Sequence, residues 1–264
     1  VLGFGFRVGF LGLLHMEIVR ERLEREYNLE IIVTNPSTNY QVLLNDNREI
    51  EIKSANDLPE MANVKSIKEP WVKGEIVCLK HSVGSVIQLI NQTRGSQGDI
   101  NFVDNHLVII EFNAPLSNIL TDFYDRLKSI TSGYGSFSYD LDGYFAGELV
   151  KLDFYVANEK IDALSVIVHK NEADKIGREV VAKLKTIIPR QLFKVSLQAA
   201  IGSRVLARED IPMLKKDVTG YLYGGDVSRK KKLWAKQKRG KTRLKKFGKV
   251  DMPTEAFQVM LKRE

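Results

Sequence analysis

The sequence has one cysteine, few prolines and no long apolar run. With Cys78 alone among 264 residues, no disulfide can form within the chain. Cys78 lies in the apolar segment GEIVCL, which favours a small buried side chain over a catalytic thiol. No stretch approaches the roughly 18 consecutive apolar residues of a membrane-spanning helix. These absences favour a globular protein of the reducing cytoplasm.

Acidic residues are missing from one segment, and this absence locates the positive charge. Positions 229 to 249 contain twelve Lys or Arg residues and no Asp or Glu. The rest of the chain has 28 basic against 33 acidic side chains, a net charge of −5. The formal charge of +7 therefore comes from a basic arm, residues 224–249, whose composition predicts disorder until a polyanion binds.

Nucleotide-binding motifs are incomplete. Four glycines stand in the first twelve positions, but a dinucleotide-binding G-x-G-x-x-G starting at Gly3 would need glycine at Val8. Residues 240–242 read Gly-Lys-Thr, like the end of a P-loop, yet the first glycine of that motif would fall at Ala235. We therefore predict no cofactor site in this chain.

Metal-binding and catalytic clusters are also missing. The two carboxylates Asp140 and Asp142 are more typical of a turn than of acid–base catalysis. No histidine has ligand partners at helical spacing, and His15 and His169 each suit a structural role at a strand-to-helix junction. We predict no metal and no catalytic residue among these groups or the remaining histidines, His81 and His106.

The first 45 residues have the pattern of a β-α-β unit. Apolar side chains alternate over 2–10, which predicts a strand, and recur at helical spacing over 13–27. A second strand is expected at 29–36, continued or followed by a third at 39–44. We interpret 1–45 as the second half of a ferredoxin-like domain, followed by a connector, 46–69, with at most one short strand.

Residues 70–156 repeat a strand-helix-strand pattern twice. The predicted strands are 71–79, 98–104, 106–115 and a pair within 136–156. Helices are expected at 82–95 and 116–135, the second with Ser117 as N-cap and Gly133 as C-cap. This order is typical of the ferredoxin-like split βαβ fold, an antiparallel sheet with two helices on one face.

Residues 157–264 form a third, smaller α+β domain. A strand at 162–170 precedes a helix at 171–188 that Pro189 ends, and 191–207 is strand-like. A short helix with a glycine turn is expected within 208–225, followed by the basic arm. The predicted fold class is therefore α+β with antiparallel sheets and a basic tail.

The composition of the arm is typical of a segment that binds nucleic acid. Lysine and arginine neutralise phosphates, and Trp234 and Phe247 can either stack on splayed bases or pack the arm onto its domain. The alternative is a peripheral membrane or scaffold module anchored by the arm. Few large apolar residues lie among the cations, so the apolar face of such a helix would be thin.

Several segments carry a resemblance to a known family. FLGLLHMEIVRERLEREYNLEIIVTNPSTNYQV resembles the second half of the third domain of elongation factor G, and more closely the LepA family, also called elongation factor 4. FYDRLKSITSGYGSFSYDL and VKLDFYV are similar to the LepA counterpart of the fifth domain. DALSVIVHK, KLKTIIPRQLF and QAAIGSRVLARE resemble the LepA carboxy-terminal domain.

The resemblance implies a ribosome-binding translational GTPase, present in the cytoplasm as a monomer. It places the GTPase domain, with its GTP and Mg²⁺, upstream of Val1, so that this chain alone is expected to be inactive. The implied partners are ribosomal RNA and proteins, tRNA and the upstream GTPase domain. A weak association with the cytoplasmic face of the membrane is kept as an alternative.

Carried over residue by residue, the resemblance and the charge give one candidate RNA-binding set. Arg94 marks a further loop where the family often has two arginines, which predicts a weaker RNA contact there. The candidate set is Arg190, Gln191, Arg204, Lys215, Lys216, Tyr223, Gly224, Gly225, Arg229, Lys230, Lys231, Lys232, Lys236, Lys238, Arg239, Lys241, Arg243, Lys245, Lys246 and Lys249.

Overall fold

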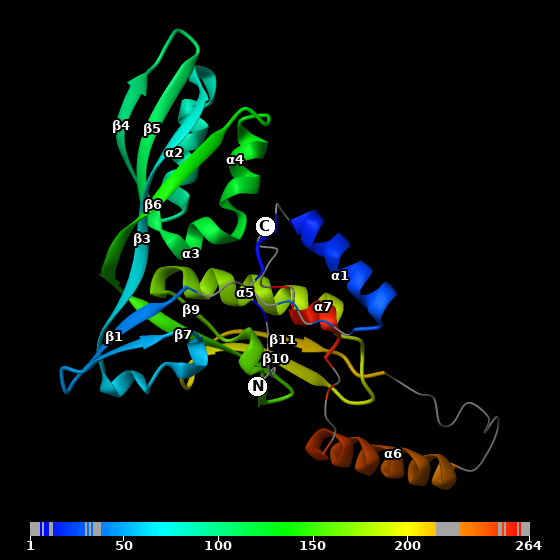
Figure 1. The fold of residues 1–264 in the computed structure, drawn as a ribbon. Helices are drawn as coiled ribbons and strands as arrows, with labels where there is room; N and C mark the ends of the chain where they lie inside the picture. The colour runs from blue at the N-terminus through cyan, green and yellow to red at the C-terminus, as the bar shows by residue number, and fades with distance from the viewer. Residues whose placement is uncertain are drawn as a thin grey trace. The chain divides into compact units, whose positions relative to one another are not determined.

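The computed structural model contains two compact units. It describes residues 6, 8–10, 13–29, 31, 33, 38–214, 227–247, 250, 252–257 and 259. One unit is built mainly from Val33–Leu149, and the other mainly from Val150–Val259 (Figure 1). Each unit has an antiparallel sheet with helices on one face, which confirms the predicted α+β class.

The first unit has the ferredoxin-like order of strands. Strands β3 (Val64–Leu79), β4 (Ser96–Phe102), β5 (Leu107–Pro115) and β6 (Ser136–Gly147) lie in the order β6-β3-β5-β4, all antiparallel. Helix α2 (Val83–Gln92) connects β3 to β4. Helices α3 (Leu116–Asn118) and α4 (Tyr124–Ile130), joined by a π-helical turn at Ile119–Phe123, connect β5 to β6.

A hairpin extends this sheet and corrects the predicted organisation. Strands β1 (Tyr40–Leu44) and β2 (Glu49–Ile52) pair with each other, and β1 pairs with the first residues of β3. The assignment of 40–44 to a β-α-β unit is therefore wrong. Strand β3 has 16 residues, whereas its neighbour β5 has 9. The first residues of β3 therefore extend beyond β5, and their backbone hydrogen-bonding groups are available to β1.

The predicted opening strands are not formed where the structure describes them. Phe6, Val8, Gly9 and Phe10 are not in a strand, and the same holds for the described positions between 29 and 33. Alternating apolar side chains form a strand only where a neighbouring strand supplies hydrogen bonds. The described part of the chain offers them none, and Phe6 is 98% exposed. The predicted helix between them is present as α1 (Leu13–Tyr27).

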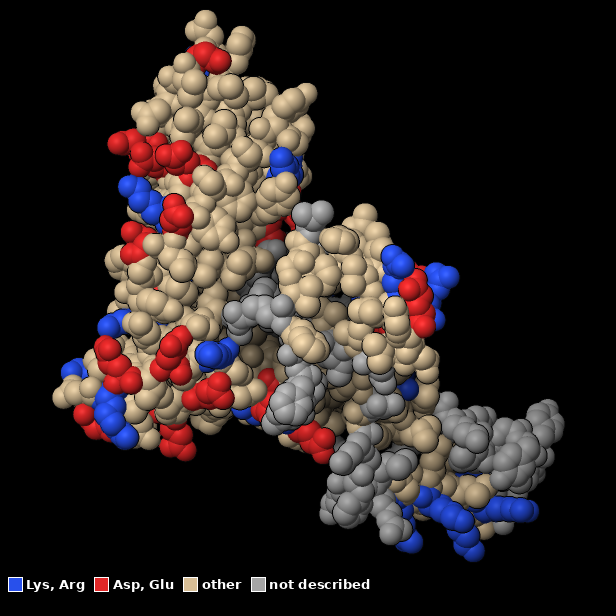
Figure 2. All heavy atoms as spheres, viewed as in Figure 1, with Lys and Arg blue, Asp and Glu red and all other residues tan. Residues whose placement is uncertain are grey.

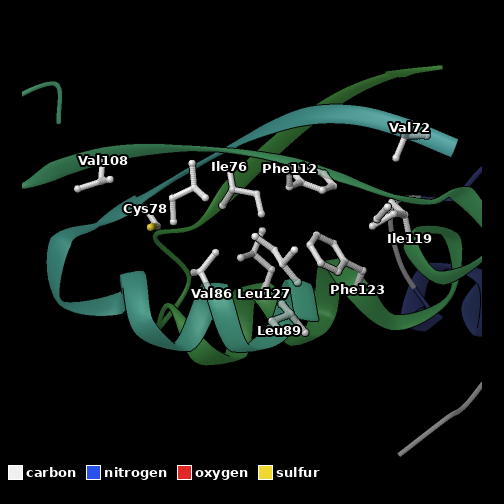
Figure 3. Close-up of a cluster of buried hydrophobic side chains, with 13 residues drawn as sticks. Val72, Ile76, Cys78, Val86, Leu89, Val108, Phe112, Ile119, Phe123 and Leu127 are labelled. Carbon is white, nitrogen blue, oxygen red and sulfur yellow. The ribbon is translucent and has the colours of Figure 1, made fainter. Parts of the chain in front are cut away.

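The core of the first unit lies between its sheet and its helices. Side chains of α2 and α4 point toward those of β3 and β5, as Figure 3 shows. Phe112, Phe123 and Phe137 meet there, with ring centroids 5.2 to 6.4 Å apart. Cys78 is fully buried in this cluster, and burial raises the pKa of its thiol, as expected for a packing residue.

Neither predicted cap of the second helix is observed. Helix α4 ends at Ile130 with Thr131 as its C-cap, so the prediction of Gly133 as C-cap is wrong by two residues. Gly133 has φ of +87°, and its N–H donates to the carbonyl oxygen of Lys128 at 2.8 Å, so it closes the turn that follows the helix. Ser117 is not the N-cap. The helix begins at Leu116 after Pro115, and the Ser117 hydroxyl donates to Asn118 instead.

The second unit has a five-stranded sheet. Strands β7 (Leu149–Val156), β8 (Glu159–Lys160), β10 (Val195–Ile201) and β11 (Arg204–Ile211) lie in the order β11-β10-β7-β8, and β9 (Val166–His169) also pairs with β7. Strand β7 was expected to pair within 136–156. It belongs to this sheet instead, where it pairs with β10 and β8. Its residue Leu152 lies 4.0 Å from the position of a Cβ on Gly177, in helix α5 (Lys170–Ile187).

Helix α5 ends before Pro189, as predicted, and packs closely on β10. A Cβ on Gly177 would lie 3.1 Å from that of Ala199, so glycine permits this approach. The short helix expected from residue 208 is wrong at its start, since 208–211 complete β11 by pairing with β10. Near the end of the chain, Thr254–Phe257 form the short helix α7.

Candidate nucleic-acid interface

The basic arm contains a helix, α6 (Val227–Phe247). Its 21 residues are mostly lysine, arginine, leucine, alanine and glutamine, all good helix formers, and Gly240 is the one weak position among them. The expectation of a disordered arm is therefore wrong for this segment. Helix formation fixes which cations share a face.

The two sides of α6 differ in exposure. Lys230, Leu233 and Gln237 are half-buried and, at 100° per residue, lie within one narrow stripe. The coloured atoms over α6 in Figure 2 are blue, since the helix contains no acidic residue. Six exposed cations occupy the arc opposite the stripe: Arg229, Lys231, Lys232, Lys236, Lys238 and Arg239.

Trp234 lies beside this cationic arc. Its side chain is 53% exposed, and Lys230 and Lys238 are one helical turn before and after it. An exposed indole between ammonium groups can stack on a base while its neighbours bind the flanking phosphates. This geometry agrees with the aromatic role predicted for Trp234.

A loop of the second unit holds two further candidates. Arg190 and Gln191 follow α5, and the backbone carbonyl of Gln191 accepts from the N–H of Leu214 at 2.8 Å. The Gln191 side chain donates to the carbonyl of Pro189 at 3.4 Å. The loop is therefore tied to the segment that follows β11.

Arg204 does not join this group. It begins β11, opposite Ile201, after a two-residue turn in which Gly202 has φ of +56°. The 7 residues of β10 separate this turn from the 190–191 loop, a distance of about 20 Å at the usual rise of a strand. Arg204 and Arg190 therefore serve opposite ends of one hairpin.

The side chains of the remaining candidates lie outside what the structure describes. Four of these residues belong to α6, whose backbone is described: Lys241, Arg243, Lys245 and Lys246. The others are Lys215, Lys216, Tyr223, Gly224, Gly225 and Lys249.

Comparison with known proteins assigns both units. Residues 156–262 match the family described as GTP-binding protein LepA C-terminus, and 66–153 match elongation factor G C-terminus. Elongation factor 4 1 of Lactiplantibacillus plantarum is 50% identical over 261 residues, covering 99% of this chain and 43% of its own length. Elongation factor 4 of Campylobacter jejuni is 49% identical, covering 99% and 44%. The chain belongs to the LepA family.

The LepA match covers the second unit from Val156 onward and includes α6. The elongation factor G match covers most of the first unit and extends into β7 as far as Asp153. The chain spans under half the length of these curated relatives. Nothing in the comparisons supports the membrane alternative. Within the described ranges, no helix is both long enough and apolar enough to cross a bilayer.

The loop at Arg94 has a different role from the one expected. Arg94 donates to both carboxylate oxygens of Glu69, at 2.8 and 3.0 Å, and to Asn118 at 3.1 Å. The Glu69 side chain is 2% exposed and that of Arg94 19%. The prediction that Arg94 contacts RNA is therefore corrected, because the buried carboxylate occupies its guanidinium.

The histidines singled out in this LepA-family chain have structural surroundings. His169 is the N-cap of α5, and its Nδ1 accepts from the backbone N–H of Asn171 at 3.3 Å. His15 packs edge-on against Phe10, with centroids 5.8 Å apart. Neither is arranged as a catalytic pair with another side chain in the contacts described.

The two aspartates near the end of β6 also differ from expectation. Asp140 and Asp142 lie within the strand, and not in the turn predicted for them. The register of β6 shifts between Leu141 and Gly143, so Asp142 is the extra residue of a bulge. Gly143 has φ of +119°, which only glycine adopts readily. No cluster of potential metal ligands occurs among the residues searched, those that the structure describes.

Proposed function

We propose that this chain is the ribosome- and RNA-binding carboxy-terminal part of a translational GTPase of the elongation factor 4 type. The observation that carries the proposal is the cationic arc of α6 in a chain whose other residues are net acidic. Kinship with relatives named elongation factor 4 supports the ribosome as partner. In this proposal tRNA or ribosomal RNA lies against the arc.

The proposal assigns no catalysis to this chain. Its sequence lacks a complete P-loop, so GTP and Mg²⁺ would be bound by a GTPase domain outside these residues. We propose the same three domains that the sequence predicts, with different boundaries. A ferredoxin-like domain would start with the β1–β2 hairpin, and a LepA-type domain with β7. The second half of a preceding domain would include α1.

The physical basis is counterion release. Six neutralised phosphates on a duplex correspond to a salt slope of about −5, or roughly a thousandfold loss of affinity between 50 and 200 mM salt. The loop at Arg190 and Gln191 would add contacts that orient the nucleic acid.

The test is filter binding of tRNA and of ribosomes at several salt concentrations. A triple variant, Lys230→Glu, Lys231→Glu and Lys232→Glu, is expected to lose at least about tenfold in affinity at 100 mM salt and to flatten the slope. The matched control replaces the same three lysines with arginine. It keeps charge and helix propensity, and therefore affinity.

Three results would contradict the proposal: no binding, binding that does not depend on salt, or an unchanged affinity of the glutamate variant. Flotation with anionic liposomes distinguishes the membrane alternative, which requires vesicle binding that survives high salt and little affinity for RNA. Nucleotide hydrolysis by this chain alone would overturn the claim that it has no catalytic site.

A further inference from the structure

Strand β6 lies at one edge of the first sheet. It pairs with β3, and no other described strand pairs along its second edge. Its 12 residues make it about twice as long as an average strand, and ten of them are exposed. The backbone N–H and C=O groups on the second edge therefore have no partner in any strand that the structure describes.

A bulge limits the part of β6 that a further strand can join. Asp142 is the extra residue between Leu141 and Gly143, and a bulge bends the strand that carries it. The six residues before it, 136–141, pair with β3 in unbroken register. We call the outer side of residues 136–141 the free edge.

One side of the free edge is apolar. Phe137, Tyr139 and Leu141 alternate along the strand and therefore point to the same side. That is the helix side, because the Phe137 ring packs against that of Phe123 at 5.2 Å. The Tyr139 ring stacks on Phe137 at 5.8 Å, yet Tyr139 is 38% and Leu141 is 70% exposed. The apolar row thus continues from the core out to the solvent.

The other side of the free edge is acidic. Ser138 and Asp140 alternate with the apolar residues and lie opposite Glu75 and Lys73 of β3. Glu75 in turn lies opposite Glu111 of β5, and the ammonium of Lys73 is 3.7 Å from the Glu111 carboxylate. Three carboxylates and one ammonium give these residues a net charge of −2.

These two sides specify what fits the free edge. A row of backbone donors and acceptors at strand spacing is matched by another extended polypeptide, and not by a nucleic acid or an anionic lipid, whose phosphates the carboxylates repel. Alternate apolar side chains of an added strand would cover Tyr139 and Leu141, and the residues between them would lie beside Asp140. Basic residues at those positions complement the acidic side, whereas β6 of a second copy would bring further carboxylates to it.

We propose that the free edge of β6 binds an extended, basic segment of another protein, which joins the first sheet as an added strand. Its apolar side chains lie on Tyr139 and Leu141, and its lysine or arginine side chains lie beside Asp140. The inference goes beyond the proposed function, since it gives the chain a protein-binding site that needs neither α6 nor RNA.

The experiment uses the full chain and a capped eight-residue peptide in which lysine alternates with valine. Calorimetry measures the affinity, and hydrogen exchange resolved by peptide fragment measures the pairing. Because alternate N–H groups of a strand point to each edge, the bound peptide is expected to protect about three of the amides in 136–141.

Two further peptides serve as controls. The same peptide with every backbone nitrogen methylated keeps the side chains and the charge but has no donors, and is expected to give no protection. A peptide with glutamate in place of lysine is expected to bind at least about tenfold more weakly, because its carboxylates lie beside those of the acidic side.

Two variants at exposed positions test the two sides of the free edge without disturbing the core. Leu141→Lys removes an apolar contact and adds a repelling cation, and is expected to weaken peptide binding about fivefold or more. Asp140→Asn removes one carboxylate and is expected to weaken it about two- to threefold. The matched control is Leu107→Lys, at a 37% exposed leucine of β5, which β3 separates from β6; it is expected to bind as the unmodified chain does.

The outcomes separate this inference from its alternatives and from the proposed function. Equal binding of the methylated peptide, or no added protection in 136–141 at saturating peptide, would overturn strand addition. Equal affinity for the lysine and glutamate peptides would overturn the basic partner, and a dimer that Leu141→Lys dissociates in light scattering would assign the edge to a second copy instead. The α6 glutamate variant is expected to keep peptide binding and Leu141→Lys to keep tRNA binding, so a failure here leaves the proposed function standing.

Discussion

The two units share an architecture but differ in the chemistry of the sheet face that their helices leave uncovered. In the first unit, Glu75 lies opposite Glu111, and Lys73 lies opposite Asp140. In the second unit, the corresponding face carries Arg208, 3.6 Å from Asp210, and Lys160, 3.2 Å from Asp153. Like charges therefore face each other on the first sheet, whereas opposite charges pair on the second.

This difference teaches that a helix-covered antiparallel sheet is a scaffold, and that its uncovered face decides its partner. Apolar packing stabilises the interior of each unit, and this packing does not depend on the charge of the exposed side chains. Surface charge can therefore vary between the two sheets at little cost in stability, and α6 adds to the contrast.

The largest expected effect comes from breaking the core of one unit alone. Phe123→Ala removes a fully buried ring 5.2 Å from that of Phe137, and is expected to cost about 3–5 kcal/mol of unfolding free energy. Hydrogen exchange resolved by peptide should show loss of protection in the first unit only. Phe154→Ala is the counterpart for the second. Equal loss of protection in both units from either variant would show that they unfold together.

The next largest effect concerns the buried ion pair. Arg94→Ala leaves Glu69 buried without its guanidinium and is expected to destabilise the first unit by about 3 kcal/mol in urea unfolding. RNA affinity should stay within twofold, because Arg94 faces inward. Arg48→Ala breaks an exposed pair with Asp46 and should have a much smaller effect. A loss of RNA affinity without loss of stability would restore Arg94 as an RNA contact.

A smaller effect is expected from acid at the edge of the second sheet. The pKa of Asp210 is lower in the folded chain, so its pairing with Lys194 stabilises the fold above the unfolded pKa and is lost as pH falls through the folded pKa. The contribution is below about 1 kcal/mol, because solvent screens the pair. Unfolding followed from pH 6 to pH 2 should show Asp210→Asn with a shallower acid dependence. An unchanged dependence would contradict this assignment.

The smallest effect concerns repulsion on the first uncovered face. Glu75→Gln removes one of two like charges directly across the β3–β5 pair and is expected to stabilise the unit by about 0.2–0.5 kcal/mol. Lys73→Gln should have the opposite sign, because Lys73 lies 3.7 Å from Glu111. Thermal unfolding at low salt measures both. A destabilised Glu75→Gln would show that this carboxylate has a favourable partner.

Much of the fold could be read from the sequence because local patterns are strong in both units. The helix α5, the helix before Gly133, the strands β4 and β5, and β3 from Trp71 onward follow from the period of the apolar residues. Residues 64–69 of β3 and strand β2 lie in the segment predicted to be a connector. Pairing could not be read in the same way. Whether β1 joins β3, or β7 joins the second sheet, depends on which distant strand has free hydrogen-bonding groups, and no local pattern records that.

The candidate site was predictable where charge alone defines it and not where the fold redirects a side chain. The cations of α6 stand out because no acid interrupts them. The sequence around Arg94 could not show whether this arginine binds RNA or pairs with a carboxylate of the protein, since its partner Glu69 is 25 residues away. Arg208 lies in a segment expected to be helical, and its pairing opposite Gln198 appears only because β11 extends to Ile211.

The burial of Cys78 has a practical consequence for studying this molecule. The chain's one thiol is enclosed in the core and its pKa is raised, so it is a poor nucleophile in the native protein. A cysteine introduced at an exposed position, such as Ala235 on α6, would react with maleimide probes far faster. Spin labels or fluorophores can thus be attached singly without removing the native thiol, and distances between α6 and bound RNA become measurable.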